Sequence, residues 1–326
     1  IIDIDSNSAL WSDCNFLKHI RQNNRKFNID KSPKVLFSKG PIIDLIIHSG
    51  AGPALEFQLI SDSFIYYNDN IEKVPKSKED VFQDDSISLI DKRRLMKFFN
   101  FVLEFDPSGE TKNQLFWDHL ISLKINPKLA TIIISSIALK LNVSDLQTIS
   151  LKTGIEAMKQ HLNSFGRFGS GALLTANYGT GSELCQAFCR YCAVYGGEYI
   201  LDLDLKSIKI NSENVVVSDG STTYTAKSII IGANFAGILE NVQINESKIH
   251  RLVCISDKPF LNDGEHVMLI IPAQCSQVDP SLDNKSEKDG AVAIQYNSNN
   301  QSCPEDTCKS QHFYSICRYT RVVVQG

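Results

Sequence analysis

The hydrophobic pattern of this chain changes its period twice along the sequence. Up to about residue 75, short apolar runs alternate with turn residues, as in β-strands. Between residues 76 and 166, apolar residues recur every three to four positions, as in amphipathic helices, and most later segments again resemble strands. The pattern predicts an α/β domain with a mixed sheet, residues 1–75 and 167–326, interrupted by a smaller all-helical domain, residues 76–166.

Local turn and cap signals locate the elements of the predicted sheet domain. Strands are expected at residues 1–5, at 34–37 and within 55–75, where Asn68-Asp69-Asn70 has the composition of a hairpin turn. A helix is expected at residues 40–50, because Gly40-Pro41 suits its start and Gly50 its end. Later strands are expected at residues 198–204, 207–212, 214–220, 222–234, 250–257, 266–273, 290–297 and 313–320.

The helical part contains four long amphipathic patterns, at residues 88–106, 113–123, 126–141 and 144–166. The first of these places its large apolar residues roughly on one face, which we expect to be buried. These residues are Leu89, Leu95, Phe98, Phe99, Val102 and Leu103.

Composition excludes several classes of protein. The net charge of −4 gives no electrostatic reason to expect nucleic acid as a partner. No apolar run approaches the length of about 18 residues that a membrane-spanning helix needs. The nine cysteines are an odd number without a signal peptide, which favours reduced thiols in the cytosol over disulfides. Because the chain begins within a strand and has no initiator Met, we expect a fragment of a longer protein.

Three cysteines in the segment LCQAFCRYC have the spacing C-x3-C-x2-C, by which three thiolates hold an iron–sulfur cluster in radical enzymes. A cluster needs an open loop, whereas residues 182–194 have the composition of a helix. On a helix, Cys185, Cys189 and Cys192 fall in one stripe, and Leu184 and Phe188 flank it. Since a reduced Cys behaves as a small hydrophobic residue, core thiols are the preferred interpretation over a metal site.

The other side of this predicted helix is polar. It carries Glu183, Gln186, Ala187 and Arg190. Glu183 and Arg190 are seven residues apart and therefore line one stripe, which can be a solvated face or a surface for a charged partner. The seven histidines have no metal-ligand spacing, and no G-x-S-x-G, H-E-x-x-H or P-loop motif occurs, so no residue is a candidate for catalysis.

A sheet domain interrupted by a helical domain is also the architecture of flavin-dependent oxidases. In that FAD/NAD-binding type of fold, a glycine-rich loop follows the first strand and an acid at the end of the second strand binds the ribose. Asp5 ends a predicted strand and is a candidate for that acid, while the glycine loop is not part of this chain. A flavin-dependent oxidoreductase is therefore an alternative function.

The segment YGTGSELCQAFCRYCAVYGG resembles the second signature block of the Rab GDP-dissociation inhibitor and Rab escort superfamily, Y-G-x-G-E-L-x-Q-x-F-x-R-x-x-A-x-x-G-G. Similar segments occur in the same order at IDIDSNS, FNIDKSPKVLFSKG, VPKSKEDVF and LIDKRRLMKFFNFVLEF. The chain departs from the family at Ser182, which is inserted into the block, and at Ala9, Leu10 and Trp11, where the family continues with Tyr-Tyr-Gly-Gly. The resemblance implies a flavoprotein-like fold.

One feature favours the escort branch of the superfamily over the inhibitor branch. In escort proteins, a Phe and an Arg eleven positions apart on the helical domain dock onto the prenyltransferase, and the inhibitors lack the Phe. Here Phe82 and Arg93 have that separation. The resemblance therefore implies that Phe82 and Arg93 bind Rab geranylgeranyltransferase, which consists of α and β subunits.

The resemblance also implies the surfaces that bind the Rab GTPase. Glu183, Gln186, Arg190 and Ile200 correspond to the family's platform for GDP-bound Rab. An apolar patch for the C-terminal tail of the Rab is expected at Ile47, Ala51 and Leu55. The helical domain is expected to shelter the geranylgeranyl lipid between helices.

The function that the resemblance implies is that of a Rab escort. The chain would bind newly made GDP-bound Rab, present it to the transferase and deliver the prenylated product to membranes. It would be non-catalytic and cytosolic, with transient membrane contact, no cofactor and no nucleic-acid partner. The alternatives are a recycling Rab GDP-dissociation inhibitor and the flavin-dependent oxidoreductase.

Overall fold

The computed structural model describes residues 18, 20–30, 32–106, 114–141, 148–232, 235, 238, 248–256, 259–261, 266–273, 290–304 and 312–320. The strand expected at residues 1–5 and the candidate residues Asp5, Ala9, Leu10 and Trp11 lie outside this part. The chain divides into two compact units. Unit 1 contains Ile1–Phe188 and Ile249–Thr320, and unit 2 contains Cys189–Lys248 and Arg321–Gly326.

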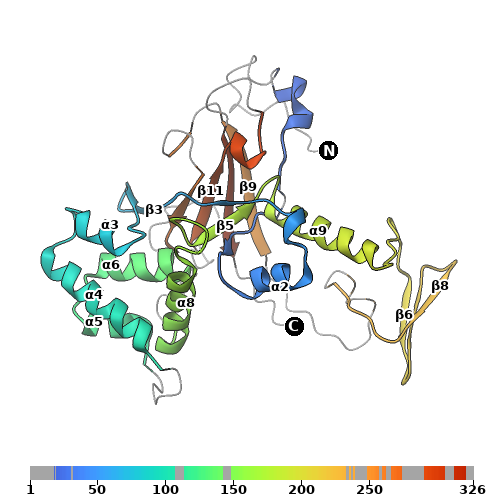
Figure 1. Ribbon diagram of the computed structural model, residues 1–326, viewed down its shortest axis with the longest axis horizontal. Helices are drawn as coiled ribbons and strands as arrows, with labels where there is room; N and C mark the ends of the chain where they lie inside the picture. Colours follow the sequence, from blue (N-terminus) through green and yellow to red (C-terminus); the bar gives the residue numbers. More distant parts are fainter. Residues whose placement is uncertain are drawn as a thin grey trace. The chain divides into compact units, whose positions relative to one another are not determined.

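The largest sheet of unit 1 includes the strands labelled β3, β11 and β9 in Figure 1. It has six strands in the order β4-β3-β10-β11-β12-β9. Strand β3 pairs in parallel with β10, from the distant C-terminal part of the chain, whereas β4 pairs with β3, β11 with β10 and β12 with β11 in antiparallel fashion. The strands are β3 (Asp62–Tyr67), β4 (Asn70–Lys73), β9 (Lys248–Ser256), β10 (Val267–Ile271), β11 (Ala291–Tyr296) and β12 (His312–Thr320). The strands expected in these regions are thereby confirmed.

The hairpin β3–β4 has the turn that its sequence predicts. Tyr67 and Asn70 are paired, so the loop consists of Asn68 and Asp69, with φ angles of 49° and 61°. Two successive left-handed residues are the requirement of a type I′ turn, and Asn and Asp adopt this conformation more easily than most residues.

A second, three-stranded sheet of unit 1 has the order β1-β5-β2, with strands β1 (Leu36–Phe37), β5 (Leu173–Ala176) and β2 (Phe57–Leu59). The predicted helix next to it is α2, Pro41–Ser49; Gly50, at φ 78°, closes it as expected. Strand β5 was not predicted, because its four residues directly follow the glycine-containing run 166–171 and precede the signature block. All four are buried, as expected for the strand that lies between β1 and β2 in this sheet.

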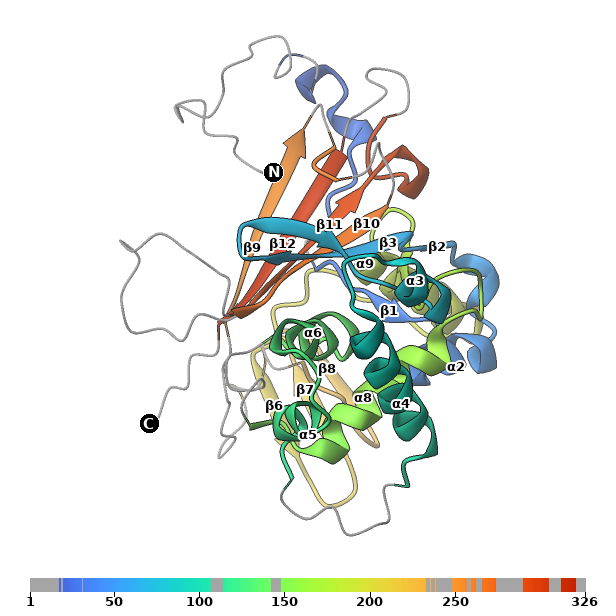
Figure 2. The same cartoon turned by 90° about the vertical axis from the view of Figure 1, so that its left-hand side faces the viewer.

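The described part of residues 76–166 contains helices and one isolated β-bridge. The helices are α3 (Lys78–Gln83), α4 (Leu89–Glu104), α5 (Phe116–Ser122), α6 (Pro127–Ile132), which continues as a π-helical turn over Ile133–Ile137, and α8 (Leu151–Ser164). Figure 2 shows α4, α5, α6 and α8 grouped together, and Phe98, Phe116, Leu120, Ile155 and Met158 are fully buried in their shared core. The mixed α/β plus helical fold class is confirmed. The proposed domain boundaries stay a prediction, since these helices belong to unit 1 together with both of its sheets.

The expected apolar face of α4 is confirmed for only part of its residues. Leu95, Phe98 and Val102 are buried and Phe99 is half-buried, whereas Leu89 is 75% exposed and Leu103 is 50% exposed. At roughly 100° per residue, Leu103 lies about 80° and Leu89 about 120° around the helix from Leu95. The predicted face was therefore too wide.

Unit 2 contains the three-stranded antiparallel sheet β6-β7-β8, with strands β6 (Ser207–Ile210), β7 (Val215–Ser218) and β8 (Thr223–Ala226). The strand predicted at residues 198–204 does not form. Asp202 has a left-handed backbone, at φ 59°, which breaks an extended run. In the described part of the chain, no helix is both long and apolar enough to cross a bilayer.

Candidate functional site

The corner between α3 and α4 presents an aromatic side chain to solvent. Ser77 caps the start of helix α3, and its Oγ accepts a hydrogen bond from the backbone N–H of Asp80 at 3.1 Å. Val81 anchors the helix in the core, and the next residue, Phe82, is 57% exposed. An exposed ring of this size forgoes about 1.5–3 kcal/mol that burial would contribute.

A buried lysine ties the two helices of this corner together. Lys92 of α4 is only 6% exposed, and its Nζ donates a hydrogen bond to the backbone carbonyl of Phe82 at 2.7 Å. This carbonyl lies at the C-terminal end of α3, where a cation is favoured by the helix dipole. The next residue on α4, Arg93, is exposed. Phe82, Lys92 and Arg93 form what we call the α3–α4 corner.

Sequence reasoning identified Phe82 and Arg93 but missed Lys92. A signal was present: Lys92 is three residues before Leu95, at a position that an amphipathic helix would fill with an apolar residue. A lysine at such a position indicates a buried hydrogen-bond acceptor that needs its ammonium group.

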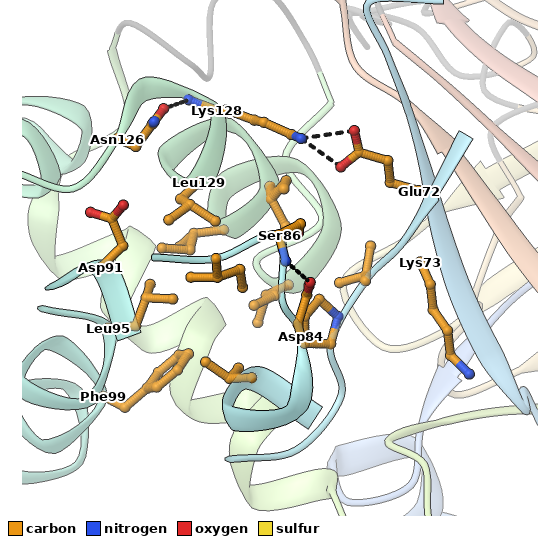
Figure 3. Close-up of a pocket in the computed structure, with 17 residues that line it drawn as sticks. Glu72, Lys73, Asp84, Ser86, Asp91, Leu95, Phe99, Asn126, Lys128 and Leu129 are labelled. Atoms are coloured by element: carbon orange, nitrogen blue, oxygen red, sulfur yellow. Dashed lines mark hydrogen bonds and ion pairs between the residues drawn. The ribbon is translucent and has the colours of Figure 1, made fainter. Parts of the chain in front are cut away.

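A small apolar cavity lies beside this corner (Figure 3). Its volume is about 100 Å³. Leu95, Phe99 and Leu129 surround its interior, and at its edge Lys128 Nζ forms an ion pair with Glu72 at 2.6 Å. The cavity therefore has an apolar interior between α4 and α6 and a charged rim.

The helix that carries the signature block, α9 (Thr180–Val194), is capped by a residue far away in the sequence. The carboxylate of the buried Asp30 accepts hydrogen bonds from the backbone N–H groups of Gly181, at 3.1 Å, and of Ser32, at 2.8 Å. A carboxylate is favoured at a helix N-terminus. Gly179 (φ 124°) has to be glycine here, since a Cβ would lie 2.8 Å from the Cβ of Asp30.

The buried face of α9 differs from the one expected. Ala187 is buried, and Leu184 and Phe188 pack with it against Ile43 and Ile46 of α2. The expected polar position of Ala187 is therefore wrong.

The three cysteines of α9 are exposed, so the core-thiol interpretation is wrong as well. Around the helix, Leu184 and Phe188 lie between Ala187 and Cys185. Their positions are therefore compatible with burial of the face that carries Ala187 and equally with burial of the face that carries the cysteines. The small Ala187 side allows the closer approach to α2. No group of three or more His, Cys, Asp or Glu side chains placed to hold a metal ion occurs in the part of the chain that the structure describes.

The residues expected to contact the GTPase lie on α9 and in the segment after it. Glu183 is half-buried in the first turn, and Gln186 and Arg190 are exposed. Successive spacings of three and four residues place these three on one face of the helix. Ile200 is 50% exposed, and its neighbours Val194, Tyr195, Tyr199 and Leu201 are also exposed. We call residues 194–201 the apolar segment.

The patch expected at Ile47, Ala51 and Leu55 stays a prediction, and only one of its residues is at the surface. Ile47 is 55% exposed, but Ala51 and Leu55 are buried. Gly50 ends α2 with a left-handed turn, and the backbone N–H of Ala51 then bonds to the carbonyl of Ile46 at 3.1 Å. The chain thus folds back over α2 and turns Ala51 inward.

Ile47 instead borders an apolar cavity of about 340 Å³. It is lined by Ile43, Ile46, Ile47, Gly52, Phe57, Leu59, Phe168 and Leu174. Phe168 is exposed, and sequence reasoning missed it because it lies in the run between α8 and β5, away from the motifs.

A buried histidine lies between the two sheets of unit 1. His266 is 3% exposed, stacks on Tyr296 and hydrogen-bonds with Thr175 Oγ1 and with the carbonyl of Leu59, both at 3.2 Å. Burial lowers the pKa of His266 from 6.5 to about 4, so its imidazole is neutral at pH 7. His266 is a structural residue of the core.

The family of the chain follows from comparison with known proteins. The model of the family described as GDP dissociation inhibitor matches residues 14–285. The chain belongs to the GDP dissociation inhibitor family.

Several relatives show which proteins of this family the chain is similar to. Rab proteins geranylgeranyltransferase component A of Saccharomyces cerevisiae is 29% identical over 299 residues, which cover 88% of this chain and 47% of the yeast protein. Component A 1 of Homo sapiens is 31% identical over 264 residues, covering 77% and 39%. Rab escort protein 1 of Arabidopsis thaliana is 30% identical over 297 residues, covering 78% and 53%. The chain thus spans about half of these relatives or less.

Among solved structures, the Rab GDI of Plasmodium falciparum has the same fold. Its TM-score is 0.73 at 18% identity, and the match covers 93% of this chain and 69% of that one.

The one insertion relative to the GDP dissociation inhibitor signature lies within α9. Ser182 is in the first turn, and its Oγ donates a hydrogen bond to the carbonyl of Gly179 at 3.0 Å. Because α9 begins at Thr180, the additional residue is part of the helix rather than of the preceding turn.

Proposed function

We propose that this chain acts as a Rab escort: it binds GDP-bound Rab, presents it to Rab geranylgeranyltransferase and delivers the prenylated Rab to membranes. In this role it is non-catalytic, needs no cofactor and works in the cytosol with transient membrane contact. The names of the relatives support the proposal. The observation that carries it is the exposed ring of Phe82, whose backbone carbonyl is held by the buried Lys92, together with the exposed Arg93, which follows Lys92 on α4.

The α3–α4 corner has the properties of an anchor for a protein partner. Aromatic and Arg side chains are enriched among the residues that dominate binding energy, and an exposed ring becomes favourable once a partner's pocket desolvates it. The hydrogen bond of Lys92 fixes the backbone of Phe82, which lowers the entropy lost on binding. In the proposal, Phe82 enters a pocket of the transferase and Arg93 pairs with an acidic group beside it.

The Rab GTPase is proposed to bind the exposed face of α9. Glu183 and Arg190 offer opposite charges along this face, and Gln186 between them can both donate and accept hydrogen bonds. Ile200 supplies an apolar contact from the apolar segment. The capping of α9 by Asp30 supports this role, since it fixes the start of the helix before any partner binds.

The lipid of the Rab is proposed to enter between α4 and α6, at the cavity of Figure 3. The present volume of about 100 Å³ is too small for a twenty-carbon chain, because an engineered cavity of about 150 Å³ holds a single benzene molecule. The helices would therefore have to separate. Each buried methylene contributes about 0.8 kcal/mol, which is enough in sum to favour such an opening.

The C-terminal tail of the Rab is proposed to bind at the apolar cavity beside Ile47. This revises the expected patch: Phe168 takes the place of Ala51 and Leu55, which are buried. A volume of about 340 Å³ can accept one or two apolar side chains of an extended peptide.

The deciding experiment is a titration of the transferase against the complex of this chain with GDP-bound Rab. The escort proposal expects tight binding that Phe82→Ala and Arg93→Ala each weaken. A chain that binds Rab but has no measurable affinity for the transferase would instead be a recycling GDP-dissociation inhibitor.

A further inference from the structure

The last turns of α9 expose two thiols that the proposed function does not use. Cys189 and Cys192 are free and exposed, and the helix ends two residues later at Val194. Both belong to unit 2. They lie on a different side of α9 from Arg190, which is between them in the sequence.

Helix geometry places the two thiols within reach of a disulfide. In an α-helix, residues three apart have Cα atoms about 5 Å apart, which is inside the usual range of about 4.4–6.8 Å for a disulfide. Their Cβ atoms are about 5–6 Å apart, whereas a disulfide needs about 3.5–4.5 Å. Closing the bond would therefore have to tighten the last turn of α9 by about 1–2 Å.

The side chain of Tyr199 interacts with both sulfurs. The nearby Cys192 thiol, and then the Cys189 thiol, raise the pKa of Tyr199 above its ordinary value, so the Tyr199 hydroxyl lies beside both sulfurs. A hydroxyl that stays protonated can donate to whichever sulfur carries a negative charge.

Gly197 also contacts Cys192 directly. A Cβ at this glycine would lie 2.2 Å from the Cys192 sulfur, so that sulfur occupies the space of a side chain. The backbone N–H of Gly197 bonds to the Cys192 carbonyl at 2.8 Å. The turn after α9 therefore folds back against Cys192.

We propose that Cys189 and Cys192 form a reversible oxidation site, and that its disulfide form binds Rab more weakly. The oxidant is hydrogen peroxide. One thiolate attacks a peroxide oxygen, the O–O bond breaks, and a sulfenic acid and water result once the leaving oxygen has taken up protons. The second sulfur then displaces the hydroxyl of the sulfenic acid, which leaves as water with the thiol proton. Two thiols and one peroxide thus give one disulfide and two waters, and a reducing thiol reverses the reaction by exchange.

The other cysteines whose side chains the structure describes are less suited to this reaction. Cys303 is buried, and burial raises its pKa to about 11, which leaves almost no thiolate at pH 7. Burial also raises the pKa of the half-buried Cys254. Cys185 is exposed, but it is not among the groups that raise the pKa of Tyr199. It is therefore the matched control.

The disulfide is expected to weaken Rab binding because Arg190 lies between Cys189 and Cys192 in the sequence. A bond between these two cysteines would enclose Arg190 in a small covalent ring. Tightening the helical turn would rotate the residues within it, including Arg190. Because the length of a charge-assisted hydrogen bond varies by only a few tenths of an ångström, a displacement of the Arg190 side chain by about 1 Å can break such a bond. This consequence rests on the proposed function of Arg190.

The chemical test uses the sequence around the pair. Trypsin cleaves after Arg167, Arg190 and Lys206, so Cys189 is in peptide 168–190 and Cys192 in peptide 191–206. After peroxide treatment of the native full chain and alkylation of the remaining thiols, we expect a crosslinked pair of these peptides that dithiothreitol separates. The crosslink should persist in Cys185→Ser and be absent in Cys189→Ser and Cys192→Ser. Tyr199→Phe should slow its formation severalfold.

Two results would overturn the chemical part. One is a disulfide confined to peptide 168–190, which would pair Cys185 with Cys189. The other is the formation of sulfinic and sulfonic acids at Cys189 and Cys192 without any crosslink.

The binding arm compares the affinity for GDP-bound Rab of the reduced, oxidised and re-reduced chain. We expect oxidation to weaken binding about tenfold, re-reduction to restore it, and Cys192→Ser to be unaffected by peroxide. A crosslinked chain with unchanged affinity would refute the effect on binding. Arg190→Ala in the same assay distinguishes the failures: if it also leaves the affinity unchanged, the proposed Rab surface is wrong, whereas if it weakens binding, only the inference about oxidation fails.

Discussion

The two regions proposed to bind proteins differ in how they are supported. The α3–α4 corner belongs to unit 1, where Val81 and Ile87 on either side of it are buried in the helical core. The apolar segment belongs to unit 2, where Val215 is the only buried residue among those that the structure describes. Both regions expose large apolar side chains, but only the first holds them on a well-packed support.

This difference teaches that exposure alone does not describe a binding surface. A fixed side chain loses little entropy on binding, so its contacts contribute more of their energy to affinity. A surface on a thinly packed unit can adapt to several partners, and each of its contacts contributes less. We therefore expect single substitutions to have sharper effects at the α3–α4 corner than on the unit 2 side of α9.

The largest expected effect is a loss of folding stability of unit 1 at low pH, which unit 2 should not share. Because burial holds the pKa of His266 at about 4 against 6.5 in the unfolded chain, the unfolded state binds the proton more readily. The contribution of His266 to the stability of unit 1 should be complete above pH 6.5 and fall as the pH drops towards 4, by about 3 kcal/mol at about 1.4 kcal/mol per pKa unit. Burial also lowers the pKa of His161 in unit 1 to about 4, so the total loss of stability should be larger than this. The measurement is denaturant unfolding from pH 7.5 to 4, followed by hydrogen exchange in each unit.

Unit 2 provides the internal control, since residues 189–248 and 321–326 contain no histidine. In His266→Asn, the pH slope should become smaller even if the variant is less stable at pH 7. An unchanged slope would show that His266 is not the residue that couples acid to the stability of unit 1.

The next largest effect concerns Phe82. Truncation of an aromatic anchor costs about 2 kcal/mol or more, which corresponds to about thirtyfold in affinity. Phe82→Ala should therefore weaken binding to the transferase by about thirtyfold and leave Rab binding unchanged, as measured by titration of each partner. Leu89→Ala is the matched control, because Leu89 is an exposed apolar residue at the start of the neighbouring helix. Equal effects of both substitutions would mean that general apolar exposure, not an anchor, determines the affinity.

Arg190→Ala tests the other region. Loss of an exposed charge-assisted contact should weaken binding of GDP-bound Rab by about 1.5 kcal/mol, or about tenfold. Cys189→Ala removes the adjacent side chain on a different face of α9 and should leave the reduced chain at the affinity of the wild type. Isothermal titration with GDP-loaded Rab measures both. If the cysteine variant loses binding and the arginine variant keeps it, the proposed face of α9 is wrong.

Local sequence signals predicted the elements that are determined locally. Helix α2 begins after Gly40 and ends before Gly50, and the β3–β4 hairpin turns at Asn68 and Asp69, as their composition indicates. Each of these features depends on the backbone preferences of a few neighbouring residues, which the sequence shows directly.

Features that depend on distant segments were predicted less well. Strand β5 is central only because β1 and β2 pair with it, and α9 buries Ala187 only because α2 approaches from that side. The hydrogen bond from Lys92 to Phe82 likewise joins two helices whose angle no local pattern determines. A family motif could therefore suggest the exposure of Phe82, whereas the pattern of its own helix could not predict it.

The smallest expected effect concerns Lys92, which supports the backbone of Phe82 but is not itself proposed to contact the transferase. Lys92→Met keeps the apolar stem of the side chain and removes the ammonium group that bonds to the Phe82 carbonyl. Losing this charge-assisted hydrogen bond should cost about 1.5–3 kcal/mol of folding stability. Because the bond acts on the transferase only through the position of Phe82, the freed end of α3 should lower affinity for the transferase by a smaller amount, about fivefold, without affecting Rab binding. Lys97→Met, on the exposed side of the same helix, is the control and should have no effect.

A double-mutant cycle decides how Lys92 acts. If it only positions Phe82, Lys92→Met should weaken transferase binding in the wild-type chain but have almost no further effect in the Phe82→Ala chain, because there is no ring left to position. If the two losses add, Lys92 acts on the interface or on stability independently of Phe82. If Lys92→Met binds the transferase as tightly as the wild type, the ring needs no fixed support, and the two regions differ in their packing but not in how they bind.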